Sequence, residues 1–427
     1  MIKRIPFIQG MAWLIVLFVL PLPFLVTFSS GLPSIYASKA LPYMLGVIAY
    51  VWMPFAIYVG TKPKWLDRLI GMPYAYMMHG IISILAIALA FLHKENSQSS
   101  GLIKLTGDYA FTIFLSLALY SLIFMAGWLT SRVKLLQLIK KGLEKLFKHE
   151  LSLWLHRLNL IATLLVFIHV QLIDYVVANT PFMAMFWLTS LFVAVAYIRS
   201  FLNLKRSNVT GHLVKNQLIA DNVRELVISV SRRAHLKLQS GDYIFISFPE
   251  ISGMTEPHPF SLVNDPKTEN QFVLTIRGDG DFTKQLSQVA IDSKVLVDGG
   301  FSLFQSVIRK NKAKELVMIG GGIGIVPLLS IAEGNPDIPT QLFYSVKKEQ
   351  DFLYQEKIAQ WNQRPQFRGQ LQVGRYSDDY ILSHLPEDKT NLVVLLGGPI
   401  SMGRHWKSFF LDQGLHADQI YFEEFSW

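Results

Sequence analysis

"HGIISILAIALAFLH" (residues 79–93) consists of thirteen mostly aliphatic residues between two histidines. A stretch this apolar suits the middle of a lipid bilayer, where an ionisable side chain is costly and is by default a candidate for function. The two imidazoles are therefore candidate core residues, members of a proton relay, or metal ligands. The rest of the chain has to decide between these three possibilities.

This stretch is one of several apolar segments in the first half of the chain, namely residues 11–29, 41–60, 70–92, 110–130, 152–176 and 182–203. Each is close to the roughly 20 residues that a spanning helix needs. Lysine and arginine are concentrated in the alternate loops 62–68 and 132–148, which predicts that these loops and the N-terminus are cytoplasmic. The sequence thus predicts a six-helix transmembrane bundle in the cell membrane. The first segment could be a cleavable signal peptide, but its weak cleavage site favours a retained helix.

Composition excludes several classes of function. The net charge of +9 lies largely in the loops between apolar segments, which argues against a nucleic-acid-binding surface. The chain contains no cysteine, so disulfides, thiolate nucleophiles and cysteine-bound metals are excluded. Any metal must be held by histidine, carboxylate or methionine.

Four histidines fall within the predicted spans. His79 and His93 lie on the third, and His156 and His169 lie on the fifth. The two pairs are separated by 14 and 13 residues, or about 21 and 20 Å of helix. Because both spans run outward, His79 shares an inner level with His156, and His93 shares an outer level with His169. Two imidazoles at each of two levels are what two stacked b-type haems require.

Other interpretations of these histidines remain. A proton relay would need carboxylates between the imidazoles, and the sequence has none there; core histidines satisfied by hydrogen bonds are the remaining alternative. In a regular helix, a separation of 13 residues leaves two side chains about 140° apart around the axis. The fifth helix must therefore be locally distorted, or its two haems are approached from different sides.

The second half of the chain resembles a water-soluble protein. Short β-like runs between about 208 and 304 predict a small antiparallel barrel. From residue 314 onward, apolar strands alternate with helical stretches, which is typical of a parallel sheet with crossover helices. We predict a transmembrane haem-binding domain at 1–206, an FAD-binding β-barrel at 207–306 and a Rossmann-like α/β domain for NADPH at 307–427.

Two motifs in the predicted barrel suit a flavin. In "HPFSLVN" (258–264), the hydroxyl of Ser261 could contact flavin N5, while His258 and Phe260 could pack against the ring and the ribityl chain. Further on, Gly280–Thr283 opens a helix whose backbone N–H groups suit a pyrophosphate, and Arg277 adds positive charge. A simple capped turn is the alternative for this second piece.

Glycine-rich turns in the last third suit a nicotinamide dinucleotide. "LVMIGGGIGIVPLLS" (316–330) has a glycine turn between a strand and a helix, which lets the backbone approach phosphates. Lys347 and Lys348 follow the next strand and favour the 2′-phosphate of NADP, although lysines there are often merely solvated. "LLGGPISM" (395–402) suits close approach of the nicotinamide. Near the C-terminus, Phe425 or Trp427 could stack on the flavin.

Together, the six spans, the histidine spacing and the motifs H-P-F-S, G-D-F-T, G-G-G-I-G-I-V-P and G-G-P-x-x-M resemble the NADPH oxidase and ferric reductase family. The resemblance implies FAD, NADPH and two b-type haems as cofactors. It implies that the haem ligands are His79, His93, His156 and His169. It implies that Ser261, Gly397 and Phe425 take part in hydride transfer, and that the remaining cofactor-binding residues are His258, Pro259, Phe260, Arg277, Gly280, Asp281, Phe282, Thr283, Gly320, Gly321, Gly322, Ile323, Gly324, Pro327, Lys347, Lys348, Gly398, Pro399 and Trp427. The chain departs from the family pattern at Val326, where threonine is usual, and at Gly397, where many members have cysteine.

The function implied is electron transfer from cytosolic NADPH through FAD and the haems to an acceptor outside. Because two histidines leave the haem iron without an open position, the acceptor is expected at the haem edge. We favour dioxygen, giving superoxide; a ferric chelate is the second possibility. Alternatives of other classes are a haem-bearing transporter with a nucleotide-sensing domain and a membrane-anchored reductase that serves a partner protein. The N-terminus contains no EF-hand or proline-rich partner motif, so we expect activity without an activating subunit.

Overall fold

The computed structural model describes the chain except for residues 1–5, 125–153, 207–208, 231–235, 268–270 and 424–427. The described residues form two compact units. One contains residues 8–66 and 72–203, and the other contains residues 204–425 with the short segments 1–7 and 67–71. The basic loop 132–148 and the residues Phe425 and Trp427 lie outside the described residues. The predicted domain boundaries at 206 and 306 stay predictions.

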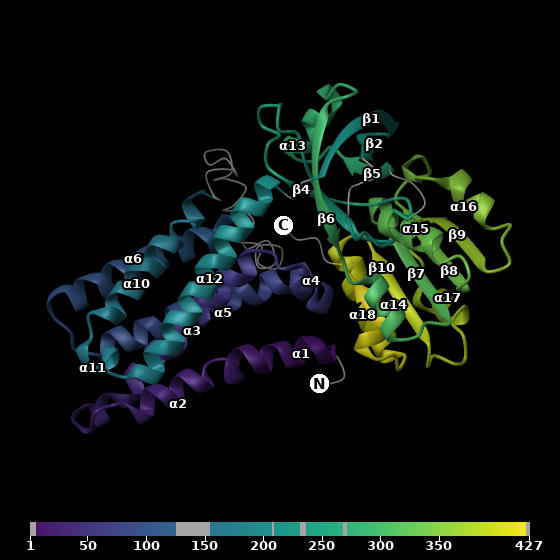
Figure 1. The fold of residues 1–427 in the computed structure, drawn as a ribbon. Coiled ribbons are helices and arrows are strands. Elements are labelled where there is room, and N and C mark those ends of the chain that lie inside the picture. Colours follow the sequence, from purple (N-terminus) through teal and green to yellow (C-terminus); the bar gives the residue numbers. More distant parts are fainter. Residues whose placement is uncertain (1–5, 125–153, 207–208, 231–235, 268–270, 424–427) are drawn as a thin grey trace. The chain divides into compact units, whose positions relative to one another are not determined.

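The first unit is helical (Figure 1). Its elements are α1 (Phe7–Leu14), the π-helical η2 (Ile15–Val19), α2 (Leu22–Ser30), the 3₁₀-helix η3 (Ser34–Lys39), α3 (Ala40–Gly60), α5 (Met72–Asn96), α6 (Gly101–Phe124), α10 (Asn159–Gln171), α11 (Asp174–Val177) and α12 (Thr180–Arg206); α4 (Lys64–Ile70) stands at the boundary between the units. Five helical segments among the described residues are long and apolar enough to cross a membrane: Phe7–Ser30, Ser34–Gly60, Met72–Asn96, Gly101–Ser121 and Thr180–Leu202. The prediction of a membrane protein is confirmed at this level.

The count of six spans is not confirmed. The predicted span 152–176 is not among the five, and its longest described helix, α10, has 13 residues. A helical turn at residues 154–156, which contains His156, precedes α10 and is separated from it by a turn at Arg157 and Leu158.

Around the turn at Arg157 and Leu158 the chain is wound more tightly than in an α-helix. There, backbone N–H groups bond carbonyls three residues earlier, in Arg157 to Trp154, Leu158 to Leu155, Leu160 to Arg157 and Ile161 to Leu158. Such bonds turn the chain by about 120° per residue instead of about 100°. The extra rotation about the helix axis acts in the direction that lessens the 140° or so by which a regular helix would separate His156 from His169. Of the two possibilities left open by the sequence, local distortion is the one observed.

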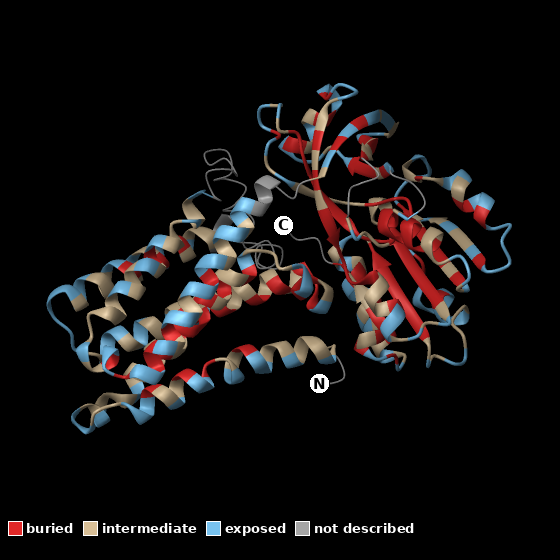
Figure 2. Ribbon diagram, in the orientation of Figure 1, coloured by how far each residue is buried: buried red, intermediate tan, exposed pale blue. Residues whose placement is uncertain are grey.

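The helical unit has a core of its own and much apolar surface. Phe24, Phe28, Tyr50, Phe182 and Phe186 are buried together. By contrast, α12 exposes a run of large apolar side chains at Trp187, Leu188, Leu191, Phe192, Val195 and Ile198. Figure 2 shows the same difference along the whole unit, whose helices are mostly tan and blue. Exposed apolar area on this scale is what lipid, not water, would cover.

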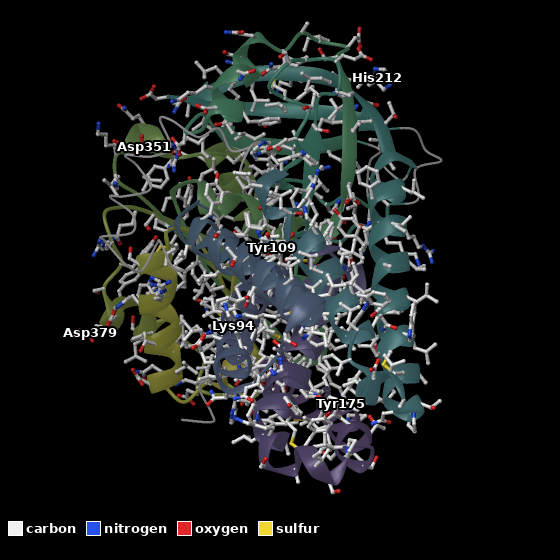
Figure 3. The ribbon with its side chains drawn as sticks, turned by 90° about the vertical axis from the view of Figure 1, so that its left-hand side faces the viewer. Lys94, Tyr109, Tyr175, His212, Asp351 and Asp379 are labelled. Carbon is white, nitrogen blue, oxygen red and sulfur yellow. The ribbon has the colours of Figure 1, made fainter. Side chains whose placement is uncertain are left out.

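An ion pair joins the C-terminal end of α5 to the second turn of α6. Lys94, labelled in Figure 3, lies 3.1 Å from Asp108 of α6. Its ammonium group also stands over the Phe111 ring, 5.1 Å from the ring centre. This pair closes the short connection between the two helices.

The second unit begins with an antiparallel sheet made of β1 (Val209–Ala220), β2 (Val223–Val230), β3 (Tyr243–Ser247), β4 (His258–Ser261), β5 (Gln271–Arg277) and β6 (Lys294–Phe301). The strand order is β4-β3-β6-β1-β2-β5. The two end strands meet just past β4, where Leu262 bridges Leu274 and the Val263 N–H donates to the Val273 carbonyl at 2.9 Å. The predicted antiparallel sheet is confirmed, and its interior is filled by apolar side chains such as Leu226, Ile244 and Leu274.

The parallel sheet that follows contains β7 (Glu315–Gly321), β8 (Thr340–Val346), β9 (Phe367–Val373), β10 (Leu392–Gly397) and β11 (Ile420–Phe422), in the order β11-β10-β7-β8-β9. Alternate side chains of β7 enter different cores: Leu316 and Met318 pack on one face, and Val317 and Ile319 on the other. Helices cover both faces, namely α14 (Phe304–Lys310), α15 (Ile325–Gly334) and α16 (Gln355–Trp361) on the first and α17 (Asp378–Ser383) and α18 (Ile400–Asp412) on the second. Burial on both faces explains the unbroken apolar runs of these strands.

Smaller elements complete this unit: α13 (Asp281–Gln285), η4 (Leu286–Gln288), η5 (Gly322–Gly324), η6 (Glu349–Asp351) and η7 (Ala417–Gln419). The chain order in the parallel sheet reverses between β7 and β10, because the strands after β7 proceed to one side and β10 returns on the other. Ligands of open α/β sheets bind beyond the carboxyl ends of strands at such a reversal. Both predicted nicotinamide turns lie there.

Candidate functional site

The four histidines of the helical unit lie in two pairs, as the sequence predicts. The ring centres of His79 and His156 are 5.9 Å apart, and those of His93 and His169 are 6.4 Å apart. Each pair therefore joins α5 to the segment around α10. The pairing by level, which was argued from spacing alone, is present in the fold.

Each imidazole has its Nδ1 atom within hydrogen-bond distance of an oxygen atom. The distances are 2.9 Å from His79 to the Ala56 carbonyl, 2.9 Å from His93 to the Pro42 carbonyl, 2.8 Å from His169 to the Ile103 carbonyl and 3.0 Å from His156 to the Ser121 hydroxyl. A carbonyl accepts only, so Nδ1 carries the proton in the first three and Nε2 is left with its lone pair. Metal-binding histidines are held in this way by the hydrogen bond of the other ring nitrogen.

The geometry of both pairs fits a metal ion between the rings. Because histidine nitrogens bind metals at about 2 Å and lie about 1 Å from the ring centre, two imidazoles on opposite sides of one ion have ring centres about 6 Å apart. The observed 5.9 and 6.4 Å agree with that value. These residues would therefore fit as the ligands of two haem irons, one held by each pair. Sequence reasoning did not predict the acceptors of Nδ1, since three of them are main-chain atoms of other helices.

The two predicted flavin motifs come together on the antiparallel sheet. β4 carries His258, Pro259, Phe260 and Ser261 and pairs with β3. The Phe282 ring on α13 lies 4.3 Å from the His258 ring and 6.0 Å from the Phe260 ring. Motifs separated by some 20 residues thus form one aromatic wall, which is suited to the flat ring of a flavin.

The predicted pyrophosphate loop is self-capped. The Gly280 N–H donates to the Thr283 hydroxyl at 2.9 Å, and that hydroxyl donates to the Gly280 carbonyl at 3.0 Å. Arg277, at the end of β5, pairs with exposed Asp279 at 2.6 Å. Asp281, the first residue of α13, is exposed. The loop is therefore held by its own side chains, as the capped-turn alternative requires, and its arginine is close by.

The two glycine turns of the parallel sheet pack directly against each other. Gly320 pairs with Gly397 in the register of β7 and β10. A side chain at Gly324 would overlap main-chain atoms of Gly397 and Gly398, and one at Gly397 would overlap the Gly324 carbonyl. Glycine is required at positions 324 and 397 because the two backbones are in direct contact there. Gly322 differs, because it has φ of +55° and a side chain there would meet no atom within 4 Å.

The other predicted nicotinamide-site residues fall into three groups. Gly321, Ile323 and Gly398 belong to the two turns, and a side chain at Gly321 would lie 3.3 Å from Pro399. Pro327 is buried in α15 and therefore does not belong to an exposed surface of the site. Lys347 and Lys348 are exposed just after β8, at the same carboxyl edge of the sheet. Their role in cofactor choice stays a prediction.

Comparison with known proteins gives a family for the second unit. Residues 209–401 match the family model of an FAD-binding domain. NADPH oxidase 1 of Mus musculus is 28% identical over 171 residues, which cover 39% of this chain and 27% of the mouse protein. Dual oxidase 1 of Sus scrofa is 28% identical over 188 residues, covering 42% of this chain and 11% of the pig protein. NADH-cytochrome b5 reductase 2 of Yarrowia lipolytica is 24% identical over 203 residues, covering 42% of this chain and 69% of that protein.

The second unit is similar to the matching regions of NADPH oxidase 1, dual oxidase 1 and a cytochrome b5 reductase. The predicted resemblance to the NADPH oxidase and ferric reductase family is thereby confirmed, as is the FAD-binding domain. The chain spans about a quarter of the mouse protein and about a tenth of the pig protein. What those whole proteins do therefore enters only as a proposal.

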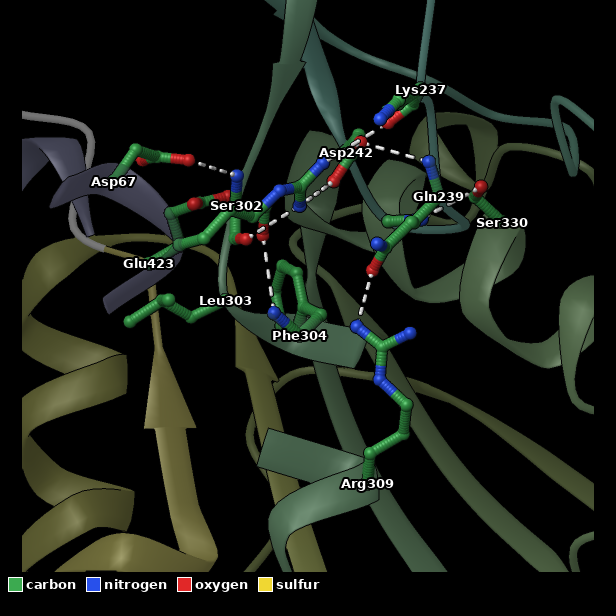
Figure 4. A network of polar contacts seen from close by, with 12 residues as sticks. Asp67, Lys237, Gln239, Asp242, Ser302, Leu303, Phe304, Arg309, Ser330 and Glu423 are labelled. Atoms are coloured by element: carbon green, nitrogen blue, oxygen red, sulfur yellow. Dashed lines mark hydrogen bonds and ion pairs between the residues drawn. The ribbon is translucent and has the colours of Figure 1, made fainter. Parts of the chain in front are cut away.

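Sequence reasoning missed a polar network in the flavin-binding unit. Segment 67–71 belongs to that unit and contains Arg68. The two terminal nitrogens of Arg68 each donate to a different carboxylate oxygen of Asp242, both at 2.8 Å. Arg68 also donates to the Ser302 carbonyl at 2.9 Å, and the Ser302 N–H donates to Asp67 at 3.1 Å. Figure 4 shows this network around Asp242 and Ser302.

Burial controls the charges in this network. Burial raises the pKa of Asp242 to about 6, although contacts with Arg68 oppose the rise. Burial also raises the pKa of Glu423 well above that of an ordinary glutamate, and nearby Asp67 and Asp242 add to the effect. Gly300 leaves room for the pair, since a side chain there would lie 2.7 Å from the Asp242 carboxylate and 2.9 Å from Arg68. The Arg68 guanidinium is thus the positive charge in a cluster that contains the carboxyl groups of Asp67, Asp242 and Glu423.

Asp242→Ala is expected to destabilise the flavin-binding unit. At pH 7.5, above the pKa of about 6, the Asp242 carboxylate is ionised, so its removal leaves the partly buried Arg68 without its main partner. The expected cost is about 3 kcal/mol, or a fall of roughly 6–12 °C in Tm, measured by release of flavin fluorescence on heating. Glu250→Ala is the control, because its contact with Lys294 is 4.0 Å long and exposed, and its loss should cost less than about 0.5 kcal/mol. Equal Tm values for the two variants would show that the Arg68–Asp242 pair is not stabilising.

Proposed function

We propose that this chain transfers electrons across the cell membrane, from cytosolic NADPH through FAD and two b-type haems to dioxygen on the other side, producing superoxide. The observation that carries the proposal is the arrangement of the four histidines in two pairs. In each pair the ring centres are separated by the distance that would accommodate one metal ion between the rings, and Nδ1 is hydrogen-bonded. They stand in the same chain as an FAD-binding domain. When bound, FAD accepts a hydride and releases electrons singly, which suits haems that accept one electron each.

The histidines would hold the haems at two levels. His79 and His156 would ligate the inner haem, and His93 and His169 the outer one. The acceptors on Nδ1 would fix the rings, so that each Nε2 faces the iron and binds it as a neutral imidazole. The stretch between His79 and His93 would be the spacer that places one haem in each half of the membrane.

The flavin-binding unit would bring both nucleotides to one place. Ser261 would contact the flavin N5, beside the aromatic wall of His258, Phe260 and Phe282. The loop from Gly280 to Thr283, with Arg277 and Asp281, would bind the flavin phosphates. The backbone N–H groups that follow Gly280 would donate to the phosphates, and Arg277 would exchange its contact with Asp279 for one with a phosphate.

The glycine turns would bind NADPH. Gly320–Gly324 would approach the phosphates at the start of α15, and Gly397–Pro399 would let the nicotinamide come close to the flavin. Lys347 and Lys348 would pair with the 2′-phosphate, which favours NADPH over NADH. We place the N-terminus and the flavin-binding unit in the cytoplasm on the charge of loops 62–68 and 132–148.

The test is cytochrome c reduction by the purified, FAD-loaded protein with NADPH in air. We expect reduction that superoxide dismutase largely abolishes, without addition of any other protein, and no reduction by the His93→Ala variant. If dismutase leaves the rate unchanged and a ferric chelate is reduced as fast without oxygen, the acceptor is iron. If NADPH reduces neither, the proposed function is wrong.

A further inference from the structure

The carbonyls that hold the histidines share a feature of sequence. Three of the four Nδ1 acceptors are main-chain oxygens within helices, and the residue four positions later is a glycine each time: Pro42 with Gly46, Ala56 with Gly60, and Ile103 with Gly107. In an α-helix the Cα–Cβ bond tilts toward the N-terminus, so a side chain covers the turn that precedes it. A glycine four residues on therefore leaves the carbonyl open on that side. The second lone pair of the oxygen can then accept a bond from another helix.

The space at the three glycines differs. A Cβ atom at Gly46 would lie 2.7 Å from the His93 Nδ1 and 2.9 Å from its Cε1. A Cβ atom at Gly107 would lie 3.2 Å from the same two atoms of His169. At Gly60 an added Cβ would meet no atom within 4 Å, although His79 bonds the carbonyl of Ala56. Both imidazoles of the outer pair thus occupy space that a side chain would fill, whereas His79 of the inner pair does not occupy such space at Gly60.

We propose that Gly46 and Gly107 are positioning residues for the outer haem. By omitting a side chain, each lets an imidazole rest on the helix and bond its carbonyl, which orients Nε2 toward the partner histidine. This inference rests on the proposed function, in which His93 and His169 are the outer ligands. Neither glycine touches the iron, so each acts only through its histidine.

The geometry predicts a graded series. Gly46→Ala forces the His93 ring away from a contact of 2.7 Å, and the ring cannot yield without giving up its bond to Pro42. Gly107→Ala asks the His169 ring to move by only a few tenths of an ångström. Gly60 also lies four residues after a carbonyl that a histidine bonds, but a methyl group at Gly60 would not contact His79. Gly60→Ala is therefore the matched control for a glycine that merely aids helix packing.

The experiment measures haem per FAD and the electron paramagnetic resonance spectrum of the oxidised full-length protein. The outer-haem signal is identified as the one missing from His93→Ala. Wild type and Gly60→Ala should each contain two haems with the same spectrum. Gly107→Ala should keep two haems with only the outer signal shifted, and Gly46→Ala should fall to about one haem and lose the outer signal.

Several results would overturn the inference. One is a Gly46→Ala protein with two haems and an unchanged outer signal; another is equal loss of both haems. If Gly46→Ala does not fold, an unchanged outer signal in Gly107→Ala overturns it instead. A wild-type protein without haem would be a failure of the proposed function, which separates the two outcomes.

Discussion

His79→Ala should lower the haem content from two per FAD to one and abolish NADPH-dependent superoxide production. The His79 ring lies 5.9 Å from that of His156, and its Nδ1 bond to Ala56 leaves Nε2 free to bind iron. Without it, the inner site keeps a single imidazole. In the proposed path, electrons from the flavin reach the inner haem before the outer one, so the loss of the inner site should interrupt the whole path. Haem is measured as its pyridine complex, and superoxide as dismutase-sensitive cytochrome c reduction.

This variant has an internal control in the flavin-binding unit. Since His79 belongs to the helical unit, FAD content and the rate at which NADPH bleaches FAD without oxygen should remain those of the wild type. The outer-haem signal should persist as well, because His93 and His169 are untouched. A variant that retains two haems, or that retains superoxide production with one, contradicts the ligand assignment.

Gly324→Ala is expected to disable hydride transfer. A methyl group at this position would overlap main-chain atoms of Gly397 and Gly398, which cannot move aside as a flexible side chain can. The two glycine turns must separate, at a cost of about 3 kcal/mol or more. Since a displacement of about 1 Å at a reacting centre costs about a hundredfold in rate, we expect FAD reduction by NADPH to slow at least about that much in anaerobic stopped flow.

Gly414→Ala separates this effect from ordinary glycine strain. Gly414 follows α18, has φ of +90° and would carry a side chain into open space. Its replacement should cost about 1 kcal/mol through backbone strain alone and leave the rate of FAD reduction unchanged. Both variants should keep two haems. A Gly324→Ala protein that reduces FAD at the wild-type rate would show that close contact of the turns is not needed for the reaction.

The pairing of the histidines could be predicted because it depends on spacing and direction alone. Spans that run the same way place residues 14 and 13 apart at matching levels, whatever the details of packing. The winding near Arg157 could not be predicted, since it depends on which carbonyls the backbone N–H groups find. The Nδ1 acceptors could not either, because Pro42, Ala56 and Ile103 carry no polar side chain; only the glycines four residues later were a readable signal.

In the second unit, the motifs were predictable and their surroundings were not. The strand-turn-helix pattern places the glycine turns at one edge of a parallel sheet, and β7 and β10 bring them into contact there. The meeting of His258 with Phe282 depends on the strand order β4-β3-β6-β1-β2-β5, which alternation of apolar residues does not specify. The Arg68–Asp242 pair joins residues 174 positions apart, with no motif around either.

The most direct test of a two-haem path fed by flavin is the absorbance change when NADPH is added without oxygen to the FAD-loaded protein. We predict that FAD bleaches and that two low-spin b-type haems per FAD become reduced, whereas no haem becomes reduced in the protein without FAD. Bleaching of FAD while the haems stay oxidised, or a haem content other than two per FAD, would contradict it.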